Sequence, residues 1–267
     1  MNCLFCKQNS DKSRSVEHII PESLGNKDHI LPRHFVCDNC NQYFAIKVEK
    51  PLLEQPYFKH LRNRSRIENK KRTVPTLDVM AIGLRPMRVE LSFDKKHGFS
   101  ITVPDDVDAK DLFSSPICRL IVPVLDSPKE DNMVLSKFLA KLAVEAFIHK
   151  ILDDKILVEE FLNHPGLDKL KQYARYGQGI SFWPYHQRRI YQEGAYFKDK
   201  KSGEGPFEIM HEFKFLYTDE SNPYFIACIM GIEYAININT PEIKNYSTWL
   251  IANSNRSPLD DANEIKL

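Results

Sequence analysis

The sequence predicts an α+β protein: a compact, cysteine-rich N-terminal part, followed by a longer part built from helices and antiparallel strands. Three observations predict this fold. Four of the six cysteines lie within the first 40 residues. Apolar residues recur at helical spacing over residues 131–153, and short runs rich in aromatic and β-branched residues follow toward the C-terminus.

Composition limits the class of protein. The chain has 267 residues, 42% of them hydrophobic and 27% charged, as in ordinary globular proteins. We find no apolar run near the roughly 20 residues that span a bilayer, so we expect no membrane partner. The start of the chain lacks the apolar segment of a secretory signal, so we expect a cytoplasmic location. In such a reducing compartment, paired cysteines are more often metal ligands than disulfides.

Charge is unevenly distributed along the chain. Residues 1–72 hold 14 Lys and Arg but 8 Asp and Glu, a net charge of about +6, and the rest of the chain has a net charge of about −5. The composition changes after the basic stretch 59–72, which predicts two domains, 1–72 and 73–267. A basic N-terminal domain is typical of a polyanion partner, although a solvated basic helix would show the same charge.

Two cysteine pairs predict a metal site. Cys3 and Cys6 are separated by two residues, and so are Cys37 and Cys40. Two such turns supply four thiolates at the tetrahedral geometry of a structural Zn²⁺ site, which leaves no open position for catalysis. The alternative is two unrelated surface pairs. The other two cysteines, at positions 118 and 228, lie in apolar sequence and are expected to be buried.

The first predicted elements follow the second cysteine pair. Residues 41–50 lack Gly and Pro and predict a helix that ends or bends at Pro51. Residues 87–93 and 98–103 have strand-like composition and are joined by a short polar turn, so they predict a β-hairpin. The apolar residues of 131–153 are spaced three and four apart and predict a buried helix.

The remaining elements complete the α+β prediction. Pro165 favours the start of a helix over residues 165–176. Three runs, 207–218, 224–230 and 234–238, predict antiparallel strands. Residues 241–252 predict a closing helix.

Between the cysteine pairs lies a candidate catalytic motif. Glu17 and His18 are followed by Ile-Ile-Pro, and Asn41 directly follows the second cysteine pair. Zinc would hold the segment before Glu17 against the helix that begins near Asn41. Together, the cysteine pairs, the Glu-His-Ile-Ile-Pro motif and the Cys-x-x-Cys-Asn motif resemble the HNH endonuclease family over about residues 1–55. That resemblance implies a ββα-metal core, a two-stranded hairpin and a helix.

The resemblance also implies a mechanism. His18 matches the general base that takes a proton from the attacking water, and Glu17 and Asn41 match the protein ligands of a divalent cation. Oxygen ligands of this kind suit Mg²⁺ or Mn²⁺, which would bind the scissile phosphate and the leaving 3′ oxygen. The expected activity is hydrolysis of DNA phosphodiester bonds to a 5′-phosphate and a 3′-hydroxyl, in restriction or phage defence.

One position departs from the family. Pro32 aligns with the family's middle Asn, which holds the loop that bears the base, and proline has no side chain that could do so. Asn26, His29 or His34 could replace it from nearby. The alternative function is a catalytically degenerate, zinc-stabilised module that binds nucleic acid or a partner.

Basic residues are candidates for contacts to phosphates, which position a duplex without reading its sequence. These candidates are Arg33, Lys47, Arg62, Arg64, Arg66, Lys70, Lys71 and Arg72. Glu49 lies eight residues beyond Asn41 and could approach the metal, but a surface position is favoured. We expect residues 73–267 to provide recognition, regulation or partner binding, with a homodimer or a second defence protein as candidate partners.

Overall fold

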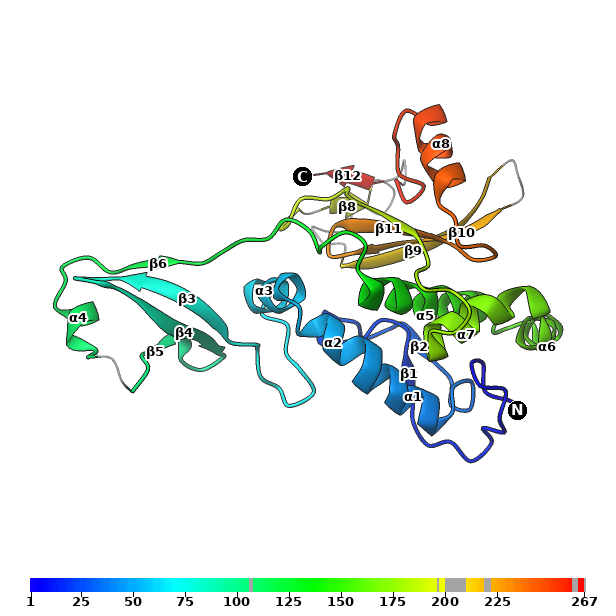
Figure 1. The fold of residues 1–267 in the computed structure, drawn as a ribbon, viewed down its shortest axis with the longest axis horizontal. Helices are drawn as coiled ribbons and strands as arrows, with labels where there is room; N and C mark the ends of the chain where they lie inside the picture. Colours follow the sequence, from blue (N-terminus) through cyan, green and yellow to red (C-terminus); the bar gives the residue numbers. More distant parts are fainter. Residues whose placement is uncertain (106–107, 196, 200–209, 219–221, 261–263, 267) are drawn as a thin grey trace. The chain divides into compact units, whose positions relative to one another are not determined.

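The structure is a computed structural model, and it describes residues 1–105, 108–195, 197–199, 210–218, 222–260 and 264–266. The predicted α+β class is confirmed, because short helices and antiparallel sheets follow the cysteine-rich N-terminus (Figure 1). The strands are β1 (Glu17–His18), β2 (Ile30–Leu31), β3 (Leu77–Ile82), β4 (Pro86–Asp94), β5 (Gly98–Thr102), β6 (Arg119–Ile121), β7 (Tyr185–Arg189), β8 (Phe197–Asp199), β9 (His211–Tyr217), β10 (Pro223–Ile229), β11 (Ile232–Asn237) and β12 (Glu264–Lys266). The α-helices are α1 (Asp38–Phe44), α2 (Lys50–Leu53), α3 (Pro56–Arg64), α4 (Lys110–Phe113), α5 (Met133–Lys150), α6 (Lys155–Asn163), α7 (Asp168–Tyr176) and α8 (Lys244–Ala252). Shorter helical turns are η1 (Glu22–Leu24), η2 (Ala45–Glu49) and η3 (Pro165–Leu167).

The chain forms two compact units. The first unit contains Met1–Ile20, Lys27–Leu52 and Lys129–Leu267, and the second contains Pro21–Asn26 and Leu53–Pro128. The first unit is therefore built from segments that lie far apart in the sequence. The predicted division into residues 1–72 and 73–267 stays a prediction.

Helix α5 is the centre of the first unit. It lies between the sheet of β7, β9, β10 and β11 on one side and the N-terminal segment with α1 on the other (Figure 1). Its side chains are buried on nearly every face, and Leu135, Phe138, Leu139 and Leu142 are fully buried. A helix that is apolar almost all round belongs in the interior of a domain. Asn132 caps its first turn by accepting hydrogen bonds from two backbone amides. No helix in the described part of the chain is long and apolar enough to cross a membrane.

The C-terminal sheet has the strand order β7-β11-β10-β9 and is antiparallel throughout. The predicted strands are confirmed, although residues 207–209 of the first one lie outside the described residues. A tight turn at Gly231, with φ of +85°, joins β10 to β11, and a Cβ there would lie 2.5 Å from the carbonyl oxygen of Tyr191. Glycine is the residue that this turn accepts. The predicted closing helix is confirmed as α8.

The second unit is built on a sheet with the order β5-β4-β3-β6. The predicted hairpin is confirmed as β4 and β5, and the Asp94 side chain accepts hydrogen bonds from two amides in its turn. Leu77, Val79 and Ala81 alternate along β3 and are buried with Leu112 of α4. This alternation gives the sheet one apolar face.

Two local features differ from the sequence predictions. Of the two outcomes expected at Pro51, an end of the helix is not observed, because α1 continues through the π-helical turn η2 into α2. The proline follows directly after this wider turn, where the regular hydrogen-bond pattern is already interrupted, so its missing N–H does not end the helix. Cys118 is exposed beside the short strand β6, whereas Cys228 is buried on β10 as expected.

Substitution of Leu139 tests the central position of α5. Leu139 is 0% exposed, so Leu139→Ala removes buried methylenes and leaves a cavity. We expect the free energy of unfolding to fall by about 2–5 kcal/mol. Leu157→Ala on α6, where the side chain is 45% exposed, is the control and is expected to cost under about 0.5 kcal/mol. Urea unfolding measures both, and equal losses would contradict the central role of α5.

Candidate functional site

The four N-terminal cysteines form one cluster. Their Sγ atoms all lie within 4.8 Å of one another, and the Sγ atoms of Cys6 and Cys37 are 3.6 Å apart. The first pair lies on a turn that ends at Lys7, and the second pair lies at the start of α1. The donor set and its spacing fit a tetrahedral Zn²⁺ ion, and four sulfur ligands would leave it no open position.

A residue far along the chain contacts this cluster. Nε of Arg175, on α7, lies 3.3 Å from the Cys40 Sγ, and its guanidinium lies 3.9 Å from the centre of the Tyr43 ring. The hydrogen bond from the Cys40 thiol lowers the pKa of Cys3 to about 4 and raises that of Cys40. Zn²⁺ with four thiolates has a net charge of about −2, and the nearby guanidinium would offset part of it.

The segment between the cysteine pairs forms a small hairpin. Glu17 pairs with Leu31 and His18 with Ile30 across β1 and β2. Asp38, in the first turn of α1, accepts hydrogen bonds from the backbone amides of residues 14 and 15 at 2.9–3.0 Å. This contact ties the chain that enters β1 to the start of α1, so hairpin and helix form a ββα arrangement.

Glu17 and Asn41 meet in this arrangement. The Asn41 Nδ2 donates a hydrogen bond of 2.7 Å to the Glu17 Oε2 and another of 3.2 Å to the Val16 carbonyl oxygen. The Glu17 side chain is only 6% exposed. His18 is half-buried, and its buried Nδ1 has no hydrogen-bond partner within the described part of the chain.

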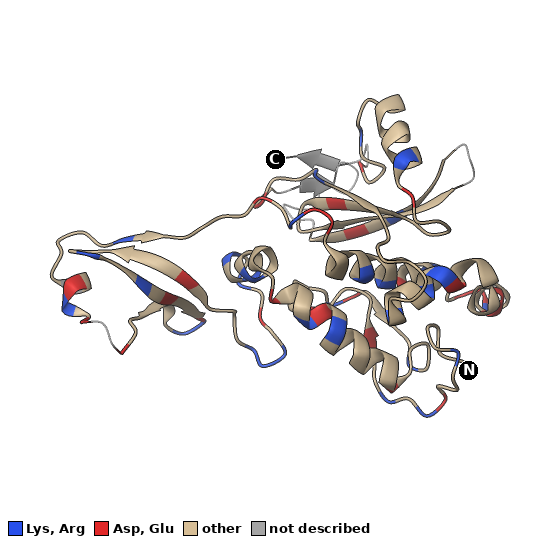
Figure 2. Ribbon diagram, viewed as in Figure 1, with Lys and Arg blue, Asp and Glu red and all other residues tan. Residues whose placement is uncertain are grey.

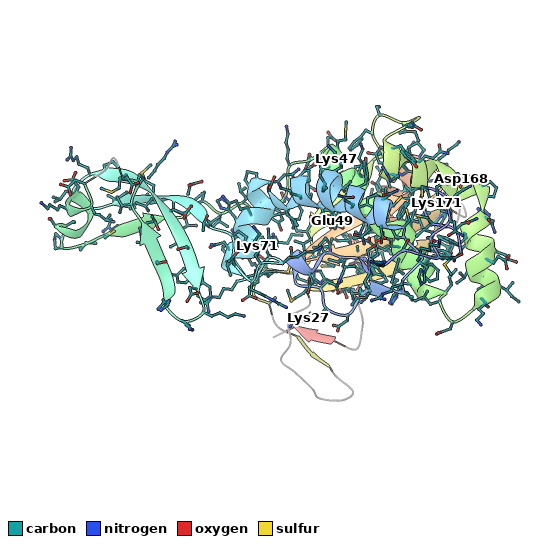
Figure 3. The ribbon with its side chains drawn as sticks, turned by 90° about the horizontal axis from the view of Figure 1, so that it is seen from below. Lys27, Lys47, Glu49, Lys71, Asp168 and Lys171 are labelled. Carbon is teal, nitrogen blue, oxygen red and sulfur yellow. The ribbon has the colours of Figure 1, made fainter. Side chains whose placement is uncertain are left out.

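A buried lysine lies beside this pair, and the sequence did not predict it. The Lys141 Nζ, on α5, lies 2.6 Å from Oε1 of Glu17, 3.0 Å from Oε1 of Glu49 and 3.0 Å from Oε2 of Glu145. The side chains of Lys141 and Glu145 are fully buried. We call these four residues the Lys141 cluster. Glu49 was expected at the surface, but its side chain is 14% exposed, and it lies on the opposite side of its helix from Lys47 (Figure 3).

The Lys141 ammonium also binds the backbone next to the candidate base. Its Nζ donates to the carbonyl oxygens of His18 at 3.2 Å and Ile19 at 3.4 Å. Burial lowers the pKa of Lys141, but the charges of Glu145, Glu17 and Glu49 outweigh it and raise the pKa well above its usual value. Removing one partner from a buried ion pair typically costs about 3–5 kcal/mol. Lys141 and Glu145 are four residues apart in the middle of a mostly apolar helix, the one sequence signal that could have indicated a buried pair.

The candidates for loop support lie in different places. Pro32 is exposed, and Asn26 is buried within the second unit. The His29 ring lies 5.0 Å from that of Phe213, and burial lowers its pKa. The His34 Nδ1 lies 3.0 Å from a carbonyl oxygen in the N-terminal loop, and its backbone has a φ of +79°. Their roles stay predictions.

Most candidate phosphate contacts are accessible. Arg33 and Lys47 are exposed in the first unit, and Arg66 stacks its guanidinium over Phe93 in the second, 4.7 Å from the ring centre. Figure 2 marks the basic residues in blue along α3 and the loop after it. The remaining accessible or half-buried candidates are Arg64, Lys70, Lys71 and Arg72. Arg62 differs, because it is 6% exposed on the inner face of α3 and burial lowers its pKa.

The comparison with known families agrees with this geometry. Residues 3–57 match the family model described as HNH endonuclease. The chain therefore contains an HNH endonuclease domain near its N-terminus, with the four-cysteine cluster inside it, and the resemblance is confirmed. The family implies a nucleic-acid substrate. No curated protein and no solved structure matches the chain.

Zinc content tests the cysteine cluster. We expect one Zn²⁺ per purified chain and expect Cys40→Ser to lose most of it, because a hydroxyl is a poor substitute for a thiolate ligand. Cys118→Ser, at an exposed cysteine outside the cluster, is the matched control and is expected to retain zinc. Elemental analysis of the purified variants measures this. Full zinc content in Cys40→Ser would contradict the assignment.

Proposed function

We propose that this protein is a metal-dependent HNH endonuclease that hydrolyses phosphodiester bonds in DNA. His18 acts as the general base, and Glu17 and Asn41 hold Mg²⁺ or Mn²⁺. One observation supports this above the others: the hydrogen bond from Asn41 to Glu17, directly beside His18 and inside the ββα segment that matches the family.

The residues fit a hard divalent cation. A carboxylate and an amide oxygen are the ligand types that Mg²⁺ and Mn²⁺ favour. Asn41 donates through Nδ2 to Glu17, so its Oδ1 stays available as a ligand. When bound, the cation would stabilise negative charge that develops on the scissile phosphate and the leaving 3′ oxygen.

His18 is suited to move a proton. Its Nδ1 is buried and has no hydrogen-bond partner among the described residues, so the other ring nitrogen, Nε2, is the one that would take a proton from a water molecule. A neutral imidazole is the common form near pH 7 and is an effective base there. Lys141 binds the His18 carbonyl oxygen, so the backbone that bears the ring is held in place.

Several parts of the proposal concern the biological setting. Exposed basic residues of each unit, Arg33 and Lys47 in the first and Arg66 and residues 70–72 in the second, would contact the phosphates of DNA. Residues 73–267 would add recognition, regulation or binding of a partner. We place the activity in the cytoplasm, in restriction or phage defence, with a second copy or another defence protein as candidate partners.

A second candidate function rests on Pro32. A proline at the family's middle position has no group that could hold the loop bearing the base, and it favours a non-cleaving module that still binds nucleic acid. The His18 experiment below separates the two functions.

His18→Ala tests the proposed catalysis. We expect the wild-type protein to nick supercoiled plasmid in the presence of Mg²⁺ or Mn²⁺ and expect the variant to lose at least about 100-fold in rate, because general-base catalysis contributes about 10²–10⁴-fold. Agarose-gel electrophoresis measures nicking. His97→Ala, in the β4–β5 turn, is the control and is expected to cut like wild type.

The opposite outcome is equally informative. Wild-type protein that binds DNA in gel-shift experiments but cuts none with either metal, even in extracts of cells that express it, would favour the non-cleaving module.

Charge removal tests the phosphate contacts. We expect the triple variant Lys70→Ala, Lys71→Ala, Arg72→Ala to bind DNA of any sequence at least about tenfold more weakly at low salt and to have a shallower salt dependence. Lys155→Ala, Lys169→Ala, Lys244→Ala removes the same charge from other exposed positions and is the matched control. Fluorescence anisotropy at several salt concentrations measures both variants. Equal losses would indicate that only net charge matters.

A further inference from the structure

We propose that Lys141 is a positioning residue of the nuclease site, so that helix α5 completes a site whose other residues lie in the segment matched to the family. Lys141 lies well beyond residue 57, where the match ends. The inference rests on the proposed function, because it assigns Lys141 the task of orienting Glu17 for the divalent cation.

Both carboxylate oxygens of Glu17 have a donor. Lys141 holds Oε1 at 2.6 Å, and the Asn41 amide holds Oε2 at 2.7 Å. A carboxylate with a donor on each oxygen cannot rotate about its terminal bond without losing one of them. The donor from α5 thus limits the orientations in which the Glu17 carboxylate can meet a cation.

Lys141 also binds the backbone of His18, the candidate base. The same ammonium donates to the carbonyl oxygens of His18 and Ile19, where β1 ends. An ammonium has three donors, and here they are directed to this one short segment and its neighbouring carboxylates. Removing them would free both the Glu17 side chain and the peptide that fixes the position of the His18 ring.

The burial of Lys141 excludes direct contact with the substrate. The Lys141 side chain is 0% exposed, so it cannot reach a phosphate of a bound duplex. It acts through Glu17 and the backbone rather than on the substrate. Glu145 lies one helical turn from Lys141, and Glu49 approaches from η2. These two carboxylates keep the ammonium charged and in place.

The experiment measures Mn²⁺ binding to the zinc-loaded, full-length protein, using the electron paramagnetic resonance signal of free Mn²⁺. We expect Lys141→Met to raise the Kd for Mn²⁺ about tenfold or more, as is common when a residue that orients a metal ligand is removed. We expect plasmid nicking to fall in parallel.

Lys171→Met is the matched control. Lys171, on α7 (Figure 3), is also buried, at 1% exposed, and it also donates to two backbone carbonyl oxygens, those of Phe161 and Leu162. It therefore reports the cost of losing a buried lysine away from Glu17. We expect this variant to lose stability but to bind Mn²⁺ like wild type.

A second variant tests the same role of Lys141 if Lys141→Met does not fold. Lys141→Met, Glu145→Leu replaces both fully buried members of the Lys141 cluster with apolar residues, which is often better tolerated than loss of one charge. We expect this variant also to lose Mn²⁺ affinity. Circular dichroism and zinc content identify the variant that is folded, and Mn²⁺ binding is compared in that variant.

Three results would overturn the inference, and they differ from one another. A rise in Kd of less than about threefold in a folded variant would show that Glu17 needs no partner from α5. Tighter Mn²⁺ binding would show that the ammonium competes with the cation. Absence of Mn²⁺ binding to the wild-type protein would contradict the proposed function itself, and the positioning role with it.

Discussion

One buried ammonium among three carboxylates joins the central helix of the first unit to its N-terminal segment. Lys141 comes from the central helix α5, whereas Glu17 and Glu49 come from the N-terminal segment. A buried charge is costly unless it is paired, so these segments must pack together for either one to be stable. The packing of α5 against the N-terminal segment and the organisation of the candidate active site therefore depend on the same contacts.

The N-terminal segment is held in a related way at two places. At the cysteine cluster, four sulfur atoms converge and Arg175 contacts Cys40. At the β1–β2 hairpin, Lys141 binds Glu17 and the backbone that follows it. Both cations come from helices that lie far along the chain. The segment thus depends on the rest of the first unit for its electrostatic balance as well as for its apolar contacts.

Local patterns predicted much of this structure. The four-cysteine site was predictable because each cysteine pair needs only one tight turn to bring its two sulfur atoms together. Helix α5 was predictable because apolar residues recur along it at helical spacing. The proximity of Glu17 and Asn41 was expected from the predicted zinc site and from the family resemblance, and their hydrogen bond agrees with it.

The missed features depend on distant partners. The spacing of Lys141 and Glu145 is also common in solvent-exposed pairs, and the carboxylates that contact Lys141 from the N-terminal segment lie far away in the sequence. Glu49 was expected at the surface because its partner, Lys141, lies far away in the sequence. Arg62 shared its sequence context with exposed basic residues, and only the packing of α3 separates it from them. Pro51 was expected to end or bend the helix, because a π-helical turn leaves no clear signal in the sequence.

The distance along the chain between Glu49 and Lys141 has a consequence for biosynthesis. More than 80 residues separate them, and ribosomes add about 5–20 residues each second. For several seconds, a nascent chain presents its acidic N-terminal groups before the lysine that balances them has been translated. The Lys141 cluster can therefore form only after α5 has been translated, so the N-terminal segment cannot reach its final packing before that point.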